Sequence, residues 1–538
     1  MRLEQIELPV NNQLLDDYWS GSEKLKPFYE YEYNDESFIT RFNYLKSKHY
    51  ETKELSKIIR SYMEPLGISN KIEENLSALE NGSVAIVGGQ QAGILTGPLY
   101  SIHKAISVIL LAKEQSEKLN ERVVPIFWIA GEDHDLDEIN HTYTIVNGAP
   151  KKRVYHERSN KKTMASTTPI RQDEMRQLLN KIFQDFGETA YTHDLYKSCL
   201  QQLEKSETFT DFFARLMNEF FKTEGLLMVD AAYTPFRQYE SSYFVKIIEQ
   251  NEKIAKAVVD KERLLHNEGF GTPINATVTN ANLFYVQEGE RYLLERKDHY
   301  YQDSTGLIKL SEEQLLNVAK TKPEQLSNNV VTRPLMQEMT IPVLAFVGGP
   351  GELAYWGTLK DAFYAMDLQM PILAPRLNIT LVDRKVDQLL SAYELSVPEV
   401  LLGKAQSLKA QYIESVQDLE AKKQIEHVHQ LLKEQYEKLN SHLNTQDLNL
   451  HAIVEKNLKY HKVQLDYLSK KIEQQVFNKH EKIIRQFDLI NAEIYPNDNF
   501  QERVYNPYQY LNSYGPNFIQ DLCALPLSIS RNHYVIHL

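Results

Sequence analysis

The fold is decided by residues 83–131, which read SVAIVGGQQAGILTGPLYSIHKAISVILLAKEQSEKLNERVVPIFWIAG. The stretch begins with a short apolar run, Ser83 to Gly89, whose β-branched residues and final glycines are typical of a buried strand. Helical spacing of apolar residues follows from Leu99 to Lys118, and Val123 to Gly131 predicts a second buried strand. Strand, glycine loop, helix and strand form a βαβ unit, which predicts a parallel sheet with a right-handed crossover.

Further strands of the same kind are predicted at Gly225 to Ala232, at Ile341 to Trp356, where the strand ends in glycines before a helix, and at Met370 to Asp383. The sheet is therefore expected to be discontinuous in sequence, with insertions between its strands. One insertion contains two apolar-rich runs around Glu288-Gly289-Glu290, which predicts a hairpin.

The predicted organisation has a parallel-sheet core in pieces, two insertions, a helical hairpin and a return segment. The core takes residues 1–144, 201–264 and 336–403. The insertions take residues 145–200, which are polar and locally basic, and 265–335. The hairpin takes residues 404–490, and residues 491–538 are expected to be loop-like and to return to the core.

The hairpin segment lacks proline and carries apolar residues three and four apart, with a shift in phase between Leu419 and Ile425. A break at Asn444 to Asp447 predicts two long helices joined by a short turn, an antiparallel coiled coil. Forty residues of helix span about 60 Å at 1.5 Å per residue, longer than a compact domain needs. A hairpin that closes on itself and a dimerisation arm both stay open.

Composition narrows the class of protein. The 538 residues include 60 Lys and Arg against 73 Asp and Glu, and the net charge of −13 disfavours a broad nucleic-acid surface. Two cysteines, Cys199 and Cys523, are too few for a disulfide framework and lack a local basic companion, so both are interpreted as structural. No apolar run reaches 18 residues, and the acidic N-terminus does not resemble a signal peptide. A cytoplasmic location is expected.

The first candidate site is the loop Gly88 to Gly97, between a strand and a helix. Glycines let backbone N–H groups approach a ligand, and the following helix N-terminus favours phosphate or carboxylate. The spacing matches neither the dinucleotide fingerprint nor a P-loop. A tight strand-to-helix turn without a ligand remains the alternative.

The second candidate site is the segment Gly131 to His141, which holds five carboxylates and two histidines after the second strand. Ligands of open parallel sheets bind at this end of the strands. The cluster suits an ammonium group, sugar hydroxyls or Mg²⁺ on phosphates, and an acidic first turn of a helix is the alternative. His134 and His141 are seven residues apart, two turns on one face of a helix, so a transition metal stays open.

The third candidate site, Val347 to Trp356, repeats the design of strand, glycine loop and helix. Glu352 falls in the first helical turn, where it serves as a cap or as a ligand. Tyr355 and Trp356 offer flat faces to a base or sugar, with core packing at least as well supported. Arg333 and Arg376 suit phosphate or carboxylate by their chemistry, and an ordinary surface role is equally open.

Four motifs together resemble the BshC family, the cysteine ligase of bacillithiol biosynthesis. They are GGQQAGILTGPLYSIHK (88–104), FWIAGEDHDLDEINH (127–141), VGGPGELAYWGTLK (347–360) and NPYQYLNSYGPNFI (506–519). The resemblance implies an α/β fold with a Rossmann-like core related to class I aminoacyl-tRNA synthetases and nucleotidylyl transferases, with two connective-peptide insertions and a C-terminal coiled coil that helps to form a homodimer. It also implies addition of L-cysteine to glucosaminyl-malate (GlcN-Mal), the last step to bacillithiol.

The resemblance assigns roles to the candidate residues. The catalytic candidates are His134, which would remove a proton, with Asp133 and Asp135. The substrate-binding candidates are Gln90, Gln91, Gly93, Trp128 and Glu132. The cofactor-binding candidates are Gly89, Gly97, Gly349, Trp356, Asn506 and Tyr510. No stably bound metal is predicted. Since an amide does not form from a carboxylate and an amine in water without activation, ATP with Mg²⁺ is inferred.

Two other classes of function are alternatives to a ligase. The chain could be a nucleotide-binding scaffold whose coiled coil recruits the true catalyst. A tRNA-binding synthetase relative is disfavoured by the net charge and by the absence of a Lys-Met-Ser-Lys-Ser signature. That absence also leaves open whether the carboxylate would be activated by adenylation or by phosphorylation.

Overall fold

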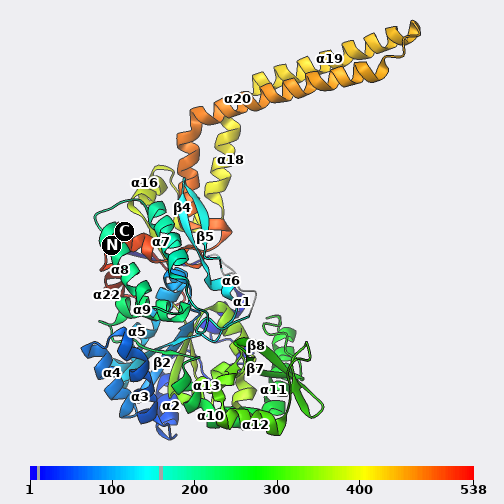
Figure 1. The fold of residues 1–538 in the computed structure, drawn as a ribbon. Helices are drawn as coiled ribbons and strands as arrows, with labels where there is room; N and C mark the ends of the chain where they lie inside the picture. Colours follow the sequence, from blue (N-terminus) through cyan, green and yellow to red (C-terminus); the bar gives the residue numbers. More distant parts are fainter. Residues whose placement is uncertain (9–11, 157–161) are drawn as a thin grey trace. The chain divides into compact units, whose positions relative to one another are not determined.

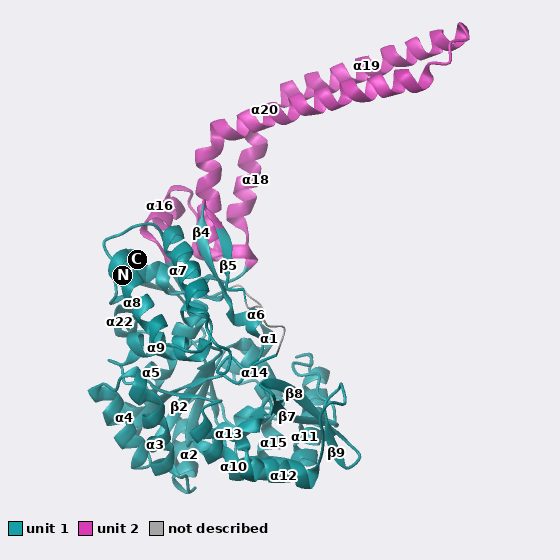
Figure 2. Ribbon diagram, in the orientation of Figure 1, with its two compact units in different colours: residues 1–146, 150–381, 499–536 teal, residues 147–149, 382–498, 537–538 magenta. Residues whose placement is uncertain are grey.

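The computed structural model describes residues 1–8, 12–156 and 162–538 (Figure 1). Residues 9–11, within the N-terminal part of the predicted core, and 157–161, within the predicted basic insertion, lie outside the described residues. The chain divides into two compact units (Figure 2). Unit 1 consists of Met1–Val146, Pro150–Leu381 and Asn499–Ile536, and unit 2 of Asn147–Ala149, Val382–Asp498 and His537–Leu538.

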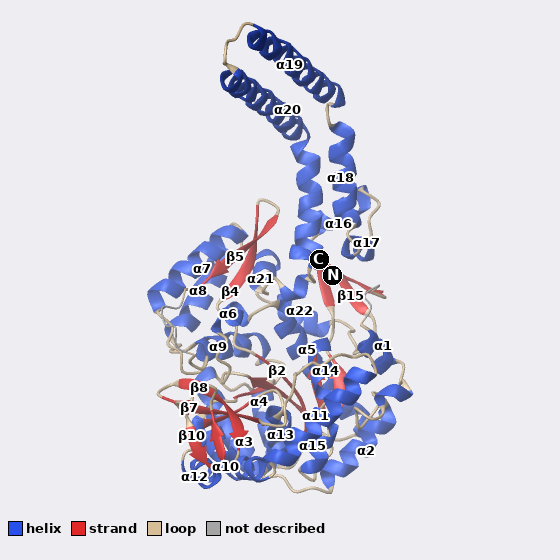
Figure 3. Ribbon diagram, turned by 90° about the vertical axis from the view of Figure 1, so that its right-hand side faces the viewer, coloured by secondary structure: helices blue, strands red, loops and turns tan. Residues whose placement is uncertain are grey.

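A five-stranded parallel sheet forms the centre of unit 1 (Figure 3). Its strands are β2 (Val84–Gln90), β3 (Val123–Ile129), β6 (Leu227–Asp230), β12 (Val343–Gly348) and β13 (Ile372–Pro375). The spatial order is β13-β12-β2-β3-β6. Counted along the chain this is 5-4-1-2-3, which is the Rossmann order. The predicted βαβ unit and the predicted strands at 225–232 and 341–348 are thereby confirmed.

The βαβ unit is closely packed. Helix α5 (Leu99–Leu119) connects β2 to β3, and the apolar residues of β2 and β3 are at most 2% exposed. Because both faces of the sheet are covered, these strands are continuous apolar runs instead of alternating ones. At Gly88 a Cβ atom would lie 2.7 Å from Val108 Cγ2, so glycine lets α5 approach the strand.

Helices and short strands complete the rest of unit 1. The N-terminal part contains β1 (Arg2–Ile6), α1 (Gln13–Trp19), α2 (Asp35–Lys46), α3 (Thr52–Met63) and α4 (Asn70–Glu80). The segment between β3 and β6 contains α6 (Leu136–Ile139), β4 (His141–Val146), β5 (Ala149–Val154), α7 (Gln172–Phe186), α8 (Thr192–Glu204) and α9 (Phe209–Phe221). After β6 come α10 (Thr234–Glu249) and α11 (Asn251–Asn267).

A second sheet, of antiparallel strands, lies between β6 and β12 in sequence, with order β10-β9-β8-β7-β11. It contains β7 (Asn280–Gln287), β8 (Glu290–Lys297), β9 (Tyr300–Gln302), β10 (Lys309–Ser311) and β11 (Leu326–Asn328), with α12 (Glu312–Thr321) before β11 and α13 (Thr332–Thr340) after it. The predicted hairpin is confirmed: β7 and β8 turn at Glu288 and Gly289, both with positive φ.

The predicted strand region 370–383 gives two strands in different sheets. Only β13 joins the central sheet; β14 (Ile379–Val382) belongs to a three-stranded sheet of order β1-β15-β14 with β15 (His533–His537). Helices α14 (Pro350–Trp356) and α15 (Lys360–Ala365) separate β12 from β13. The expectation of a loop-like return segment was wrong in detail, because residues 499–538 also form α21 (Tyr508–Tyr514) and α22 (Phe518–Ala524).

Unit 2 is helical. It contains α16 (Arg384–Ala392), α17 (Val397–Leu401), α18 (Lys404–Val416), α19 (Leu419–Thr445) and α20 (His451–Ile494). Helices α19 and α20 lie side by side (Figures 1 and 3), which confirms an antiparallel hairpin. The prediction of two helices was wrong in one respect: the first arm is interrupted at Gln417, whose ψ of 137° is extended, and Asp418 caps α19 through Ala421 N. This interruption accounts for the shift in phase of the apolar stripe.

Within the described residues, no helix is long and apolar enough to cross a membrane.

Candidate active site at the carboxyl edge of the parallel sheet

A cavity of about 540 Å³ opens at the carboxyl ends of β2, β3 and β12. The chain passes from β2 to β3 on one side and reaches β12 on the other, so β2 and β12 flank the topological switch point, where open parallel sheets bind ligands. The volume is within the usual range for small-molecule sites, about 300–1,000 Å³. The cavity wall consists of Gly89, Gln90, Gln91, Tyr100, Lys104, Trp128, Ala130, Asp133, Glu138, Val330, Arg333, Pro334, Gln337, Phe346, Gly349, Gly351, Glu352, Tyr355, Arg376 and Arg503.

Packing fixes the first glycine loop. A Cβ atom at Gly89 would lie 2.5 Å from the carbonyl oxygen of Trp128, and one at Gly93 would lie 2.7 Å from Gly97 Cα. Gly97 also has a φ of +70°. These glycines are therefore required by the fold, and Gly89 lines the cavity as well.

The same loop contains backbone strain. Leu95 and Thr96, both fully buried, have φ values of 52° and 69°. A positive φ is unfavourable for bulky and β-branched residues and persists only where the surroundings impose it. The Thr96 hydroxyl donates a 2.6 Å hydrogen bond to the Leu95 carbonyl. Strain of this kind clusters at functional loops, which agrees with the position of this loop beside the cavity.

Lys104, on the second turn of α5, connects the two glycine turns. Its ammonium donates to the Gly89 carbonyl at 2.7 Å, to Gln90 Oε1 at 3.1 Å and to Glu352 Oε2 at 2.5 Å. The side chain is 2% exposed, and burial lowers the pKa of Lys104, although Glu352 partly opposes the shift. Because it is paired with Glu352, the ammonium places a cation at the switch point, in the wall of the cavity.

The second glycine turn is held by Glu352. Gly349 N donates to Glu352 Oε2 at 2.8 Å, which caps the short helix α14. The backbone around Gly351 is open, since a Cβ atom there would meet nothing within 4 Å. Glu352 thus acts as the cap that its position predicts, while its other contact is Lys104.

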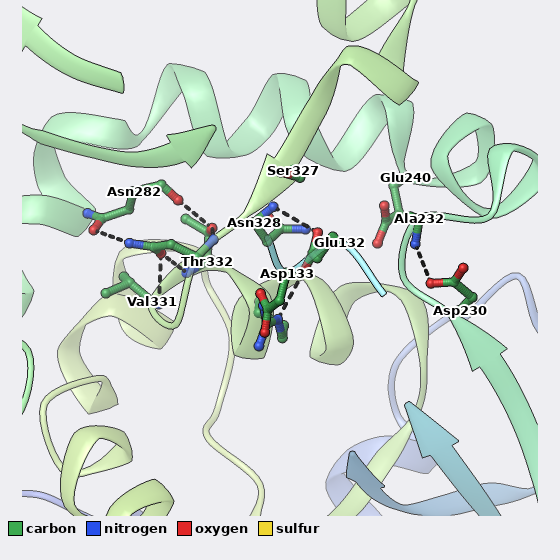
Figure 4. Close-up of polar contacts among 12 residues, drawn as sticks. Glu132, Asp133, Asp230, Ala232, Glu240, Asn282, Ser327, Asn328, Val331 and Thr332 are labelled. Carbon is green, nitrogen blue, oxygen red and sulfur yellow. Dashed lines mark hydrogen bonds and ion pairs between the residues drawn. The ribbon is translucent and has the colours of Figure 1, made fainter. Parts of the chain in front are cut away.

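Glu132 is fully buried among arginines behind the cavity wall. It accepts hydrogen bonds from Arg237 and from Arg333 Nε at 3.0 Å. Asn328 N also donates to it, at 3.2 Å (Figure 4). Burial alone would raise the pKa of Glu132, but Arg237, Arg333 and Arg291 outweigh it and lower the pKa to about 2. Glu132 does not line the cavity; it holds Arg333, which does.

Asp133 lies in the cavity wall, next to Glu132. Arg333 Nη2 donates to Asp133 Oδ1 at 2.7 Å, and Arg291 Nη1 approaches the same oxygen at 3.4 Å. Its side chain is 23% exposed, so the carboxylate is oriented by two cations and remains accessible.

His134 lies beside the cavity wall but is not part of it. Arg291 Nη1 is 3.3 Å from His134 Nδ1, and the imidazole packs edge-on against Phe284 at 5.7 Å. Burial and then Arg291 lower the pKa of His134. This shift favours the neutral imidazole, which is the form that can accept a proton.

The prediction that His134 and His141 share a helix face was wrong. Helix α6 is a single turn, Leu136–Ile139, and His141 already belongs to β4, where its Nδ1 lies 2.9 Å from the Asp137 carbonyl. Asp135 is exposed and precedes α6. Throughout residues 1–8, 12–156 and 162–538 no three His, Cys, Asp or Glu side chains are grouped to hold a metal ion.

Gln90, Gln91 and Trp128 all line the cavity. The Gln91 amide donates to Glu138 Oε2 at 2.9 Å, which links the first loop to the acidic segment. Trp128 is 1% exposed and packs edge-on against Phe236.

Four of the predicted cofactor-binding residues lie outside the cavity wall: Gly97, in the first glycine loop, and Trp356, Asn506 and Tyr510. Trp356 is buried and stacks on Phe346 and Phe363. Asn506 is buried, and its amide donates to Thr142 Oγ1 at 2.7 Å. Tyr510 is buried and stacks on Phe518.

Arg376 ties the wall to the C-terminal segment. Its guanidinium donates to both oxygens of Glu502, at 2.9 and 2.5 Å, and His103 Nδ1 lies 3.0 Å from Glu502 Oε2. Burial would raise the pKa of Glu502, but Arg376 and His103 lower it. Arg376 is 5% exposed and so is a wall residue with an internal ion pair, not an ordinary surface residue.

Comparison with known protein families identifies the chain. Residues 1–377 match the model described as bacillithiol biosynthesis BshC, N-terminal Rossmann-like domain, and residues 379–538 match that of the BshC C-terminal coiled-coil domain. The chain belongs to the BshC family. The Rossmann-like core and the helical C-terminal region expected from the sequence are confirmed.

Relatives in the BshC family cover the whole chain. A protein of Lysinibacillus sphaericus named "Putative cysteine ligase BshC" is 55% identical over 538 residues, 100% of both chains. One of the same name from Bacillus licheniformis is 35% identical over 548 residues, again 100% of both. A crystal structure titled as a putative arginyl-tRNA synthetase from Campylobacter jejuni shares 10% sequence identity with this chain. The match covers 81% of this chain and 98% of that one, and the TM-score is only 0.22.

Sequence reasoning about this BshC-family chain missed the polar wall residues Lys104, Gln337 and Arg503, whereas Glu138 lies in the predicted acidic segment. Lys104 had a usable signal, since it is a basic residue in an apolar helix that follows a glycine loop. Gln337 and Arg503 had none, because nothing in their neighbourhood in sequence indicates that they meet the switch point.

Proposed function

We propose that the chain is a ligase that joins the carboxylate of L-cysteine to the amine of GlcN-Mal and so forms bacillithiol. Membership of the BshC family and the name of its relatives support a cysteine ligase. The observation that carries the proposal is the single cavity at the switch point, whose wall combines two glycine turns, the cations Lys104 and Arg333 and the carboxylates Asp133 and Glu352.

The wall fits a phosphate-bearing co-substrate. The open backbone at Gly351, the exposed Arg503 and the buried ammonium of Lys104 together offer N–H donors and positive charge. ATP, with Mg²⁺ as its counter-ion, would supply activation of the carboxylate. Gly351 and Arg503 are the residues that would hold its phosphates, and the ammonium of Lys104 adds positive charge beside them.

The side of the cavity that contains Asp133 suits the amine of GlcN-Mal. Asp133, fixed by Arg333 and still partly exposed, would bind the sugar ammonium. An ammonium has to lose a proton before it attacks, and the neutral imidazole of His134, on the residue after Asp133, would accept it. The exposed Asp135 would add negative charge near the entrance.

We also propose a homodimer formed through the coiled coil. Helices α19 and α20 expose large apolar side chains, among them Leu419, Val428, Leu439, Ile453 and Phe477. Exposed apolar residues along a hairpin favour burial against a second copy. Analytical ultracentrifugation of the full chain should give twice the mass of 62.6 kDa, and a monomer at micromolar concentration would contradict the dimer.

The ligase is tested directly by incubating the purified full chain with L-cysteine, GlcN-Mal and ATP and measuring bacillithiol by mass spectrometry after thiol labelling. We expect bacillithiol that depends on all three substrates and falls strongly in Asp133→Asn and His134→Ala. No bacillithiol with any nucleotide and divalent cation would contradict a direct ligase. If both variants then sustained normal thiol levels in cells, a scaffold that recruits the catalyst would be the remaining function.

A further inference from the structure

The α13 side of the cavity carries a largely buried amide without a protein partner. Gln337 is 3% exposed and lines the cavity, and within the described residues no hydrogen bond to its side-chain amide is found. An amide in a cavity wall that has no protein partner is available to pair with a ligand.

The neighbouring arginine fixes the geometry of this wall. Arg333 and Gln337 are four residues apart on α13 and lie on the same face of the helix. Arg333 donates through Nε to Glu132 at 3.0 Å and through Nη2 to Asp133 at 2.7 Å. A guanidinium has five N–H donors, so these two contacts leave others available on a side chain that lines the cavity.

The chemistry of this wall matches one class of substrate. A primary amide carries both donors and an acceptor, and an α-amino acid carries an ammonium and a carboxylate on one carbon. The remaining N–H groups of Arg333 suit the carboxylate, and the amide oxygen of Gln337 can accept from the ammonium. The apolar surfaces of Val330, Pro334 and Phe346 in the same cavity suit a small, weakly polar side chain.

We propose that Gln337 binds the amino-acid substrate and that the α13 wall, formed by Arg333 and Gln337, is the amino-acid subsite. This inference rests on the ligase function proposed above. The phosphate-bearing co-substrate would bind at the switch-point wall around Lys104 and Gly351. The amino acid and this co-substrate would then occupy different sides of one cavity.

The chain offers a matched control. Gln115, on α5, is 1% exposed and its Oε1 also lacks a partner in the described residues, but it does not line the cavity. Gln337→Met and Gln115→Met therefore remove the same amide from equally buried helical positions. Only the first should change ligand binding.

The experiment is calorimetric titration of L-cysteine into the full-length wild type and both variants, with and without a non-hydrolysable ATP analogue. Folding is checked by circular dichroism. We expect Gln337→Met to weaken L-cysteine binding at least tenfold, Gln115→Met to leave it within twofold, and the KM for GlcN-Mal to stay within twofold in both. Cysteamine lacks the carboxylate of L-cysteine, and 3-mercaptopropionate lacks its ammonium. Each should bind the wild type at least tenfold more weakly than L-cysteine.

The outcomes separate this inference from the ligase function. Gln337-dependent binding of L-cysteine without bacillithiol formation would support the subsite while the ligase fails. Bacillithiol formation with an unchanged KM for L-cysteine in Gln337→Met would overturn the subsite while the ligase stands. Equal losses in both glutamine variants, or no binding of L-cysteine to the wild type under either condition, would also overturn it.

Discussion

The carboxyl edge of the parallel sheet has a filled half and an open half. At β3, a Cβ atom on Gly131 would lie within 2.8 Å of Ser166, Asp230 and Thr210, and Glu132 is enclosed by arginines. At β12, Gly351 has open space around it and Glu352 borders the cavity. Both halves are glycine followed by acid in the sequence. The same Gly-Glu pattern therefore packs into the interior at β3 and borders the open cavity at β12. The two uses differ in how deeply the residues are buried.

The largest expected effect comes from Glu132→Gln in the filled half. Arg237 and Arg333 would each lose a buried charged partner, which costs about 3–5 kcal/mol of unfolding free energy. All three tryptophans, Trp19, Trp128 and Trp356, lie in unit 1, so fluorescence during denaturation at pH 7 reports on this unit. The exposed Glu138→Gln is the control, and an equal loss in both variants would contradict a filled half.

Lys104→Met tests the link between the open half and the first glycine loop. We expect kcat/KM of bacillithiol formation to fall about 100-fold, because the cation at the switch point is lost. Lys360→Met is the control: Lys360 also donates to backbone carbonyls, those of Lys26 and Tyr29, but lies outside the cavity wall. A Lys104 variant with normal kinetics would show that the link is only structural.

Gly131→Ala and Gly351→Ala test the comparison itself. The added methyl at Gly131 would lie 2.0 Å from Ser166 Oγ and 2.3 Å from Asp230 Oδ1, and overpacking of this kind costs about 1–3 kcal/mol. The methyl at Gly351 meets nothing, so its unfolding free energy should change by less than about 0.5 kcal/mol. Equal thermal midpoints for the two variants would remove the distinction between the halves.

A pH dependence is expected from Glu240, on α10 behind Glu132. Burial raises its pKa to about 8, although Arg237 opposes the shift, whereas an unfolded chain has the ordinary glutamate value. The folded state therefore binds the extra proton between these pH values, and stability falls as pH rises from about 4.5 to 8. The unfolding free energy of Glu240→Gln should therefore gain on that of the wild type by up to about 1.4 kcal/mol per pH unit between pH 5 and pH 8. A constant difference between the two proteins in chemical denaturation would contradict this.

The sequence predicts the local parts of this architecture and not the distant ones. The βαβ unit at 83–131 and the hairpin at Glu288 and Gly289 follow from periodicity and turn chemistry, which act within a few residues. The partners of Glu132 do not, because Arg237 and Arg333 are 105 and 201 residues away. Helix α6 ends after one turn because the chain enters β4 at His141, which pairs with the next strand, β5; this local hairpin was missed because helical spacing was read through it.

The candidate site was predicted to the level of segments. The two glycine turns and Asp133 lie in the cavity wall, whereas Trp356, Asn506 and Tyr510 pack in the interior. Aromatic and amide side chains near a glycine motif suit a ligand or a core equally well. Only the three-dimensional packing separates these outcomes.

The pairing of Arg376 with Glu502 bears on how the protein is made. Arg376 and His103 meet Glu502 across 126 and 399 residues of chain. During translation, the helix that carries His103 and Lys104 leaves the ribosome long before the carboxylate that Arg376 needs. A nascent chain shorter than about 503 residues therefore has an unpaired arginine and an incomplete cavity wall, so the site can mature only late in synthesis.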